Sequence, residues 1–103
     1  MIKAVAYYRA ASPEGAEMGL QRQKEAVREY AKKNGFEIAA EVEAIESGTS
    51  ADRDSLRQLK EEVDRTESKV VLTRNIDRIA RNPLVMEEVA DNLGGVDIRG
   101  VEG

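Results

Sequence analysis

The chain has 103 residues, 41% of them hydrophobic and 35% charged, which suits one globular domain with a modest core. It contains no cysteine and no histidine, which excludes disulfides, thiolate metal sites and histidine as a general base or metal ligand. The net charge of −4 argues against tight nucleic-acid binding by the isolated chain, and because signal-peptide and membrane-length apolar segments are absent we expect a cytoplasmic protein with no metal, no cofactor and no membrane contact.

The first part of the chain predicts a strand, a helix and a second strand. Residues 2–8 form an apolar, β-prone run, and residues 10–18 contain turn formers and predict a loop. A helix is predicted from about residue 18 to residue 34, because residues for a buried face recur at helical spacing. These residues are Leu20, Gln23, Val27 and Tyr30. Residues 36–43 alternate apolar and polar side chains, which predicts a strand with one exposed face.

The second part predicts helix, strand, helix and strand. After a loop over residues 44–52, Asp52 can cap a helix that runs to about residue 66. Residues 69–73 predict a short buried strand, and a helical stretch then follows until it is interrupted at Asn82 and Pro83. These two residues fit the start of a last helix, which stops at the Gly94–Gly95 pair before a fourth strand over 96–101. The residues expected inside are Leu56, Leu59, Val63, Met86, Val89 and Leu93.

This order of elements predicts an α/β domain of three layers, flavodoxin-like, with a mainly parallel four-stranded sheet and helices on both faces. No linker divides the chain, so residues 1–103 form one domain. In such sheets the ligand site lies beyond the carboxyl ends of the strands. Three loops should meet there: residues 9–19, 45–53 and 74–81.

Arginines concentrate in these three loops. Residues 69–82 hold four basic residues and one acidic residue, a local charge of +3 in an acidic chain. Several guanidinium groups that face one point favour an anion, and arginine suits bidentate contact with phosphate oxygens. The charged loop residues are Arg9, Arg53, Arg74, Asp77, Arg78 and Arg81. They predict a phosphate or phosphodiester site, although Asp77 and Arg81, four residues apart, would also suit an ordinary surface ion pair on a helix.

Five short motifs, in order along nearly the whole chain, resemble those of the serine site-specific recombinases. Tyr7-Tyr8-Arg9-Ala10-Ala11-Ser12 resembles Tyr-x-Arg-Val-Ser-Thr, and Leu20-Gln21-Arg22-Gln23 resembles Leu-x-x-Gln. Glu43-Ala44-Ile45-Glu46-Ser47-Gly48 resembles Asp-x-x-x-Ser-Gly, and Arg53-Asp54-Ser55-Leu56 resembles Arg-Pro-x-Leu. Residues 70–81, a strand followed by Asp77-Arg78-Ile79-Ala80-Arg81, resemble the strand before Asp-Arg-Leu-x-Arg.

The resemblance implies an N-terminal catalytic domain of the resolvase, invertase and large integrase type. In that family a serine attacks a DNA phosphodiester and becomes linked to the 5′ phosphate without a metal, within an assembly of several copies. The roles of clamping and orienting the phosphate fall on Arg9, Arg53, Asp77, Arg78 and Arg81. Supporting roles fall on Tyr7, Gln23, Glu43, Ser47 and Arg74.

The chain departs from the family pattern at the nucleophile. The expected serine position holds Ala11, whose methyl group cannot attack phosphorus. Ser12 would point to the opposite face if the strand continued that far, but a one-residue bulge could bring it into place. A serine-to-alanine change introduced by engineering is a third explanation. Because Ser12 is followed by Pro13, it also suits an ordinary turn.

A second departure is length, because family members continue into a dimerisation helix and a DNA-binding domain. We therefore expect a fragment or a stand-alone relative. Three functions stay open: a recombinase catalytic domain that is inactive as written, a non-catalytic binding or regulatory module of the same fold, and a binder of small phosphate compounds. Weak binding to DNA is expected from this chain alone.

Overall fold

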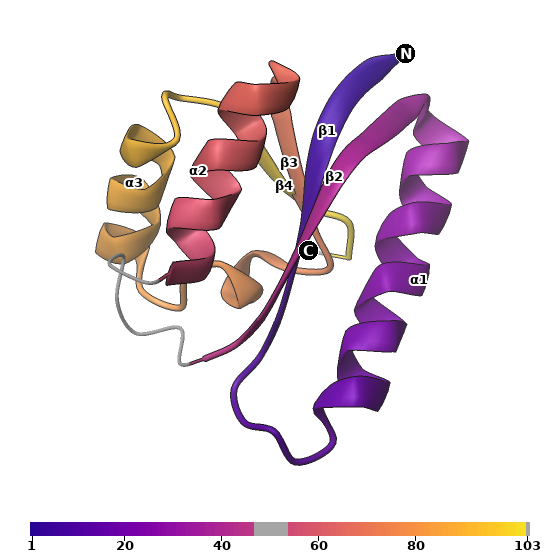
Figure 1. Ribbon diagram of the computed structural model, residues 1–103, viewed down its shortest axis with the longest axis vertical. Coiled ribbons are helices and arrows are strands. Elements are labelled where there is room, and N and C mark those ends of the chain that lie inside the picture. The colour runs from indigo at the N-terminus through magenta and orange to yellow at the C-terminus, as the bar shows by residue number, and fades with distance from the viewer. Residues whose placement is uncertain (47–53, 103) are drawn as a thin grey trace.

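A computed structural model describes residues 1–46 and 54–102, and this part of the chain forms a four-stranded sheet in the order β2-β1-β3-β4 (Figure 1). Every neighbouring pair of strands is parallel. The strands are β1 (Ile2–Ala10), β2 (Phe36–Ile45), β3 (Val70–Thr73) and β4 (Asp97–Gly100). The helices are α1 (Ala16–Asn34), α2 (Asp54–Thr66), α3 (Pro83–Asn92) and the 3₁₀ turn η1 (Ile76–Arg78). The predicted three-layer α/β class is confirmed.

Helices cover both faces of the sheet. Figure 1 shows α1 on one face and α2 and α3 on the other. Alternate residues of β1 supply the two halves of the core: Tyr8 packs in the cluster that includes Val27 of α1, and Tyr7 packs in the cluster that includes Leu59 of α2. By the same alternation, Arg9 faces the side of α2 and α3 at the end of the central strand.

The apolar spacing of the helices predicts their buried faces correctly. Val27, Leu59 and Val89 are buried in α1, α2 and α3, as expected. Asn82 caps α3 by accepting a hydrogen bond from the Leu84 backbone N–H, and Pro83 is the first helical residue. Helix α1 begins at residue 16, earlier than predicted, and β1 extends two residues further, to residue 10.

Strand β2 does not keep its apolar side chains on one face, contrary to the prediction. The register between β1 and β2 shifts at Ala4/Val5, because Ala39 is an extra residue in β2. Ile38 therefore packs with the α1 cluster, whereas Ala40 packs with the α2 and α3 cluster. A bulge of this kind reverses the facing of every later side chain in a strand.

The predicted helical stretch after β3 is wrong apart from one short turn, η1. An α-helix through residues 76–82 would use the carbonyls of Asp77 and Arg78 as acceptors for backbone N–H groups four residues later. In the structure both carbonyls accept hydrogen bonds from the Arg9 side chain. These two carbonyls therefore bond to a side chain of β1 and not to the N–H groups of a continuing helix.

Candidate anion-binding site

A polar cavity of about 360 Å³ opens at the carboxyl edge of the sheet and is lined in part by η1. Its lining residues are Arg9, Asn75, Asp77, Arg78 and Arg81. Four of the residues predicted to clamp or orient a phosphate are therefore brought to one place from β1, from η1 and from the segment before α3. Two further predicted residues, Arg53 and Ser47, lie outside the described part of the chain.

Arg9 lines this cavity and is 1% exposed. Its Nε donates to the carbonyl of Arg78 at 2.6 Å, and its Nη2 donates to the carbonyl of Asp77 at 3.2 Å. Its Nη1 donates to the carbonyl of Glu46 at 2.8 Å. One guanidinium group thus ties the end of β2 to η1, and much of its hydrogen-bonding capacity is directed at main-chain oxygen atoms.

The other cations of the cavity are less engaged. Arg78 is half-buried and Arg81 is exposed, and within residues 1–46 and 54–102 neither forms an ion pair. The Nε atom of Arg78 is buried without a hydrogen-bond partner in that part of the structure. Asp77 is exposed on the same rim and forms no ion pair with Arg81 there. The guanidinium groups of Arg78 and Arg81 are therefore available to contact an anion in the cavity.

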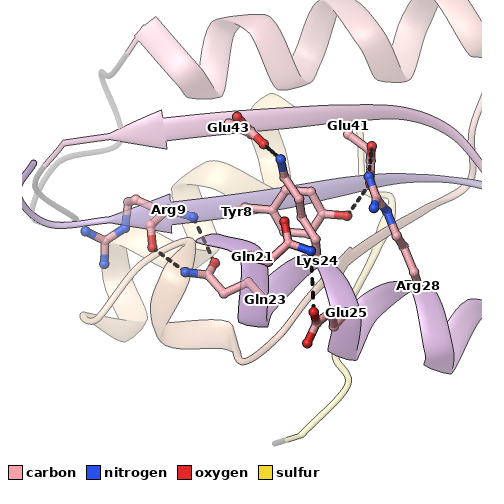
Figure 2. A network of polar contacts seen from close by, with 9 residues as sticks. All are labelled: Tyr8, Arg9, Gln21, Gln23, Lys24, Glu25, Arg28, Glu41 and Glu43. Carbon is pink, nitrogen blue, oxygen red and sulfur yellow. Dashed lines mark hydrogen bonds and ion pairs between the residues drawn. The ribbon is translucent and has the colours of Figure 1, made fainter. Parts of the chain in front are cut away.

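Gln23 fixes the backbone at Arg9, as Figure 2 shows. The Gln23 Nε2 donates to the Arg9 carbonyl at 2.9 Å, and the Arg9 backbone N–H donates to the Gln23 Oε1 at 3.0 Å. Strand β3 pairs with β1 only as far as Tyr7 and Thr73, so the amide of Gln23 satisfies backbone groups beyond the end of that pairing. Gln23 is 1% exposed, which places it in a structural role at the edge of the site.

Tyr7, a predicted supporting residue, belongs to a hydrogen-bonded group with Ser55 and Glu46. This group was not predicted from the sequence. The Tyr7 hydroxyl lies 2.8 Å from the Oγ of Ser55, and Ser55 donates to the Glu46 carboxylate. Ser55 is 4% exposed. Its place at the variable position of the Arg53-Asp54-Ser55-Leu56 motif was the signal available, but one serine at a helix start is usually a cap and carries no functional signal by itself.

Two predicted supporting residues lie away from the cavity. Glu43 projects from β2 toward α1 and forms an ion pair with Lys24 (Figure 2), on the opposite face of the sheet from Arg9. The bulge at Ala39 decides this facing. Arg74 turns toward the end of the chain, where its Nε lies 2.8 Å from the Glu102 carboxylate.

A charged cluster beside Glu43 holds α1 against the sheet. Arg28 contacts the Glu41 carboxylate through two donors at 2.9 Å each, and the Tyr8 hydroxyl donates to it at 2.6 Å (Figure 2). The bond to Arg28 holds the pKa of Glu41 below its ordinary value, against an opposing effect of burial. Burial, followed by the bond to Glu41, raises the pKa of Tyr8 far above its ordinary value. This cluster is structural.

The predicted nucleophile position lies just beyond the end of β1. The strand stops at Ala10, and Ala11 and Ser12 are exposed residues of the following bend. The alternation of side chains along a strand therefore does not extend to Ser12, so the premise that it faces away from Arg9 does not hold. Neither residue lines the arginine cavity.

In the described part of the chain, no helix is long and apolar enough to span a membrane.

Comparison with known proteins identifies the family of the chain. The model described as "Resolvase, N terminal domain" matches residues 4–101. The catalytic domain of ISC1926 TnpA, an IS607-like serine recombinase, is 31% identical with a TM-score of 0.84, and the match covers 99% of this chain and 69% of that one. A resolvase family site-specific recombinase from Streptococcus pneumoniae is 28% identical with a TM-score of 0.82, over 99% of this chain and 73% of that one.

A more distant structure shares the fold alone. The N-terminal catalytic domain of TP901-1 integrase is 19% identical, with a TM-score of 0.74, over 96% of this chain and 77% of that one. No curated protein matches the sequence.

Proposed function

Because the chain belongs to the family of the resolvase N-terminal domain, we propose that it is the catalytic domain of a serine site-specific DNA recombinase that lacks its nucleophile as written. Its fold is that of the serine recombinase catalytic domain. The partner is DNA, and the working form is an assembly of copies. Residues 1–103 supply the phosphate-handling part of the enzyme, without a metal.

One observation carries this proposal: Arg9, Arg78 and Arg81 line a single polar cavity at the carboxyl edge of the sheet. In the proposed complex Arg78 and Arg81 contact the non-bridging oxygens of the scissile phosphodiester. Guanidinium groups placed in advance where negative charge develops stabilise a pentacoordinate transition state without reorganisation during the reaction. Asp77 also lines the cavity, and its carboxylate limits the local positive charge.

The missing nucleophile explains why we expect no reaction from the chain as written. In the family reaction a serine oxygen bonds to phosphorus, the P–O bond to the 3′ oxygen breaks, and the serine proton leaves with the leaving oxygen or with solvent. Ala11 offers no oxygen at the matching position. Ser12 is the alternative nucleophile, because β1 ends before it and its side chain is exposed in the bend that follows.

The decisive experiment supplies the missing parts. The chain is fused to the dimerisation helix and DNA-binding domain of a recombinase with a known site, and labelled DNA is resolved on a denaturing gel. We expect no covalent band with Ala11 and a shifted band with Ala11→Ser. A band from the unchanged fusion that vanishes on Ser12→Ala would identify Ser12 as the nucleophile. The absence of any band from an assembled Ala11→Ser fusion would refute the catalytic proposal.

Ala11 itself favours a second candidate, a non-catalytic module of the same fold. Such a module would keep the arginine cavity for binding and would form mixed assemblies with active relatives. The Ala11→Ser fusion discriminates between the two, because a module that has lost catalysis forms no covalent band even when the serine is restored. A binder of small phosphate compounds would instead bind a free nucleotide in preference to DNA of equal phosphate concentration.

A further inference from the structure

The hydroxyl group of Ser55 has no part in the phosphate contacts proposed above, yet it is buried and fully engaged. It lies in the first turn of α2 and is 4% exposed, and it does not line the arginine cavity. Its Oγ donates to the Glu46 carboxylate, which can only accept, so the single hydroxyl proton is used there. The Tyr7 hydroxyl, at 2.8 Å, is then the donor to Ser55.

Glu46 joins this buried group to the cavity. Its backbone N–H donates to the Ala10 carbonyl at 2.9 Å, and its own carbonyl accepts from the Arg9 Nη1 at 2.8 Å. Its side chain accepts from Ser55. Glu46 is therefore held at both its main chain and its side chain, and one of these contacts fixes one end of the Arg9 guanidinium.

Arg9 passes this restraint to η1. With Nη1 held by the Glu46 carbonyl, its Nε and Nη2 donate to the carbonyls of Arg78 and Asp77. These are the residues whose side chains line the cavity. The guanidinium group is planar and rigid, so fixing one of its N–H donors also fixes the directions of the others. The orientation of η1 thus depends on the place of Glu46.

From these contacts we infer that Ser55 is a positioning residue of the arginine site: through Glu46 and Arg9 it sets the η1 turn that carries Arg78. The inference rests on the proposed function for its meaning in phosphate binding. Its structural part, the dependence of Arg9 on Ser55, stands on the hydrogen bonds alone.

The test compares Ser55→Ala with Ser68→Ala in the whole chain. Ser68 is a matched control, because it is also a buried serine, 3% exposed, whose Oγ is hydrogen-bonded at 2.6 Å to Thr66. It follows the carboxyl end of α2, at the opposite edge of the sheet from the cavity. Two readouts are taken by NMR: exchange of the Arg9 Nε–H with solvent, and titration of the Arg78 Nε–H signal with inorganic phosphate.

For Ser55→Ala we expect roughly 10-fold faster exchange at Arg9 and a loss of phosphate affinity on the order of 3- to 10-fold, the range of coupling through one altered contact chain. Ser68→Ala should change neither, even if both variants lose similar stability. Ser55→Thr keeps the hydroxyl and should restore both values. If Ser55→Ala does not fold, Glu46→Ala removes the same side-chain contact from a half-buried position and should reproduce both losses.

Wild-type values of Arg9 exchange and phosphate affinity in Ser55→Ala, or equal changes in Ser68→Ala, would overturn the inference. Failure of the wild-type chain to bind phosphate would refute the proposed site instead. In that case the Arg9 exchange rate still decides whether Ser55 positions Arg9, so the two failures are distinguishable.

Discussion

Replacing Gln23 with leucine should be among the most damaging single changes on α1. Its side-chain amide makes two hydrogen bonds to the backbone of Arg9, at 2.9 and 3.0 Å, and it is 1% exposed. Leucine has a similar volume but leaves the Arg9 N–H and C=O without these partners. Each unsatisfied buried group costs about 1–3 kcal/mol. Burial of the leucine side chain offsets about 1–2 kcal/mol of that loss.

The two groups together cost about 2–6 kcal/mol, so the middle of these ranges gives a net loss for Gln23→Leu of about 2–3 kcal/mol. This is a large part of the stability of a domain of this size. In urea, where the slope is about 1–3 kcal/mol per molar for small proteins, this lowers the unfolding midpoint by roughly 1–2 M. The measurement is urea denaturation followed by far-UV circular dichroism, together with hydrogen exchange at the Arg9 amide, which should lose protection.

Gln21→Leu is the matched control for this prediction. Gln21 lies one half-turn away on the same helix, is exposed, and has a long 3.4 Å contact with Glu25. Its replacement should change stability by no more than about 0.5 kcal/mol, as is usual for surface positions. Two outcomes would contradict the reasoning: equal stabilities for the two leucine variants, or an Arg9 amide that stays protected from hydrogen exchange in Gln23→Leu. Either would show that Gln23 does not stabilise the backbone at the end of β1.

Three further outcomes are expected. Because Arg28 holds the pKa of Glu41 below its ordinary value, Glu41 contributes stability at neutral pH that is lost as the pH falls through its lowered folded-state pKa. The difference in urea midpoint between wild type and Glu41→Gln should therefore be present at pH 7 and disappear at pH 2, and a constant difference would contradict this. Glu67 has a φ of 55°, so Glu67→Gly should stabilise the domain by about 0.5–1 kcal/mol in thermal unfolding, and a destabilised variant would refute the strain. The chain should bind DNA weakly, with an affinity that falls steeply as salt rises. In a fluorescence titration, Arg81→Ala should lower the slope of log affinity against log salt concentration by about 1. Tight sequence-selective binding at moderate salt would argue against a single arginine site.

The helices follow from local pattern. Apolar residues at helical spacing predicted the buried faces of α2 and α3, and Asn82-Pro83 predicted the start of α3, because capping and periodicity depend on residues only a few positions apart. Strand β2 was harder, because the bulge at Ala39 arises from its register with β1, which is a contact between distant segments. Glu43 was assigned to the site by its motif resemblance, but the bulge turns its side chain toward α1.

The site itself divides in the same way. Motif order along the chain predicted the family. The order of strands and helices predicted the parallel sheet and the meeting of Arg9, Arg78 and Arg81 at one edge, because a β-α-β order fixes where the loops after the strands gather. Only the tertiary structure decided what each group does there. The Arg9 side chain donates to two carbonyls of η1 and to the carbonyl of Glu46, and the Glu46 carboxylate accepts from Ser55. Buried polar groups need partners, and most of these partners lie far away in the sequence.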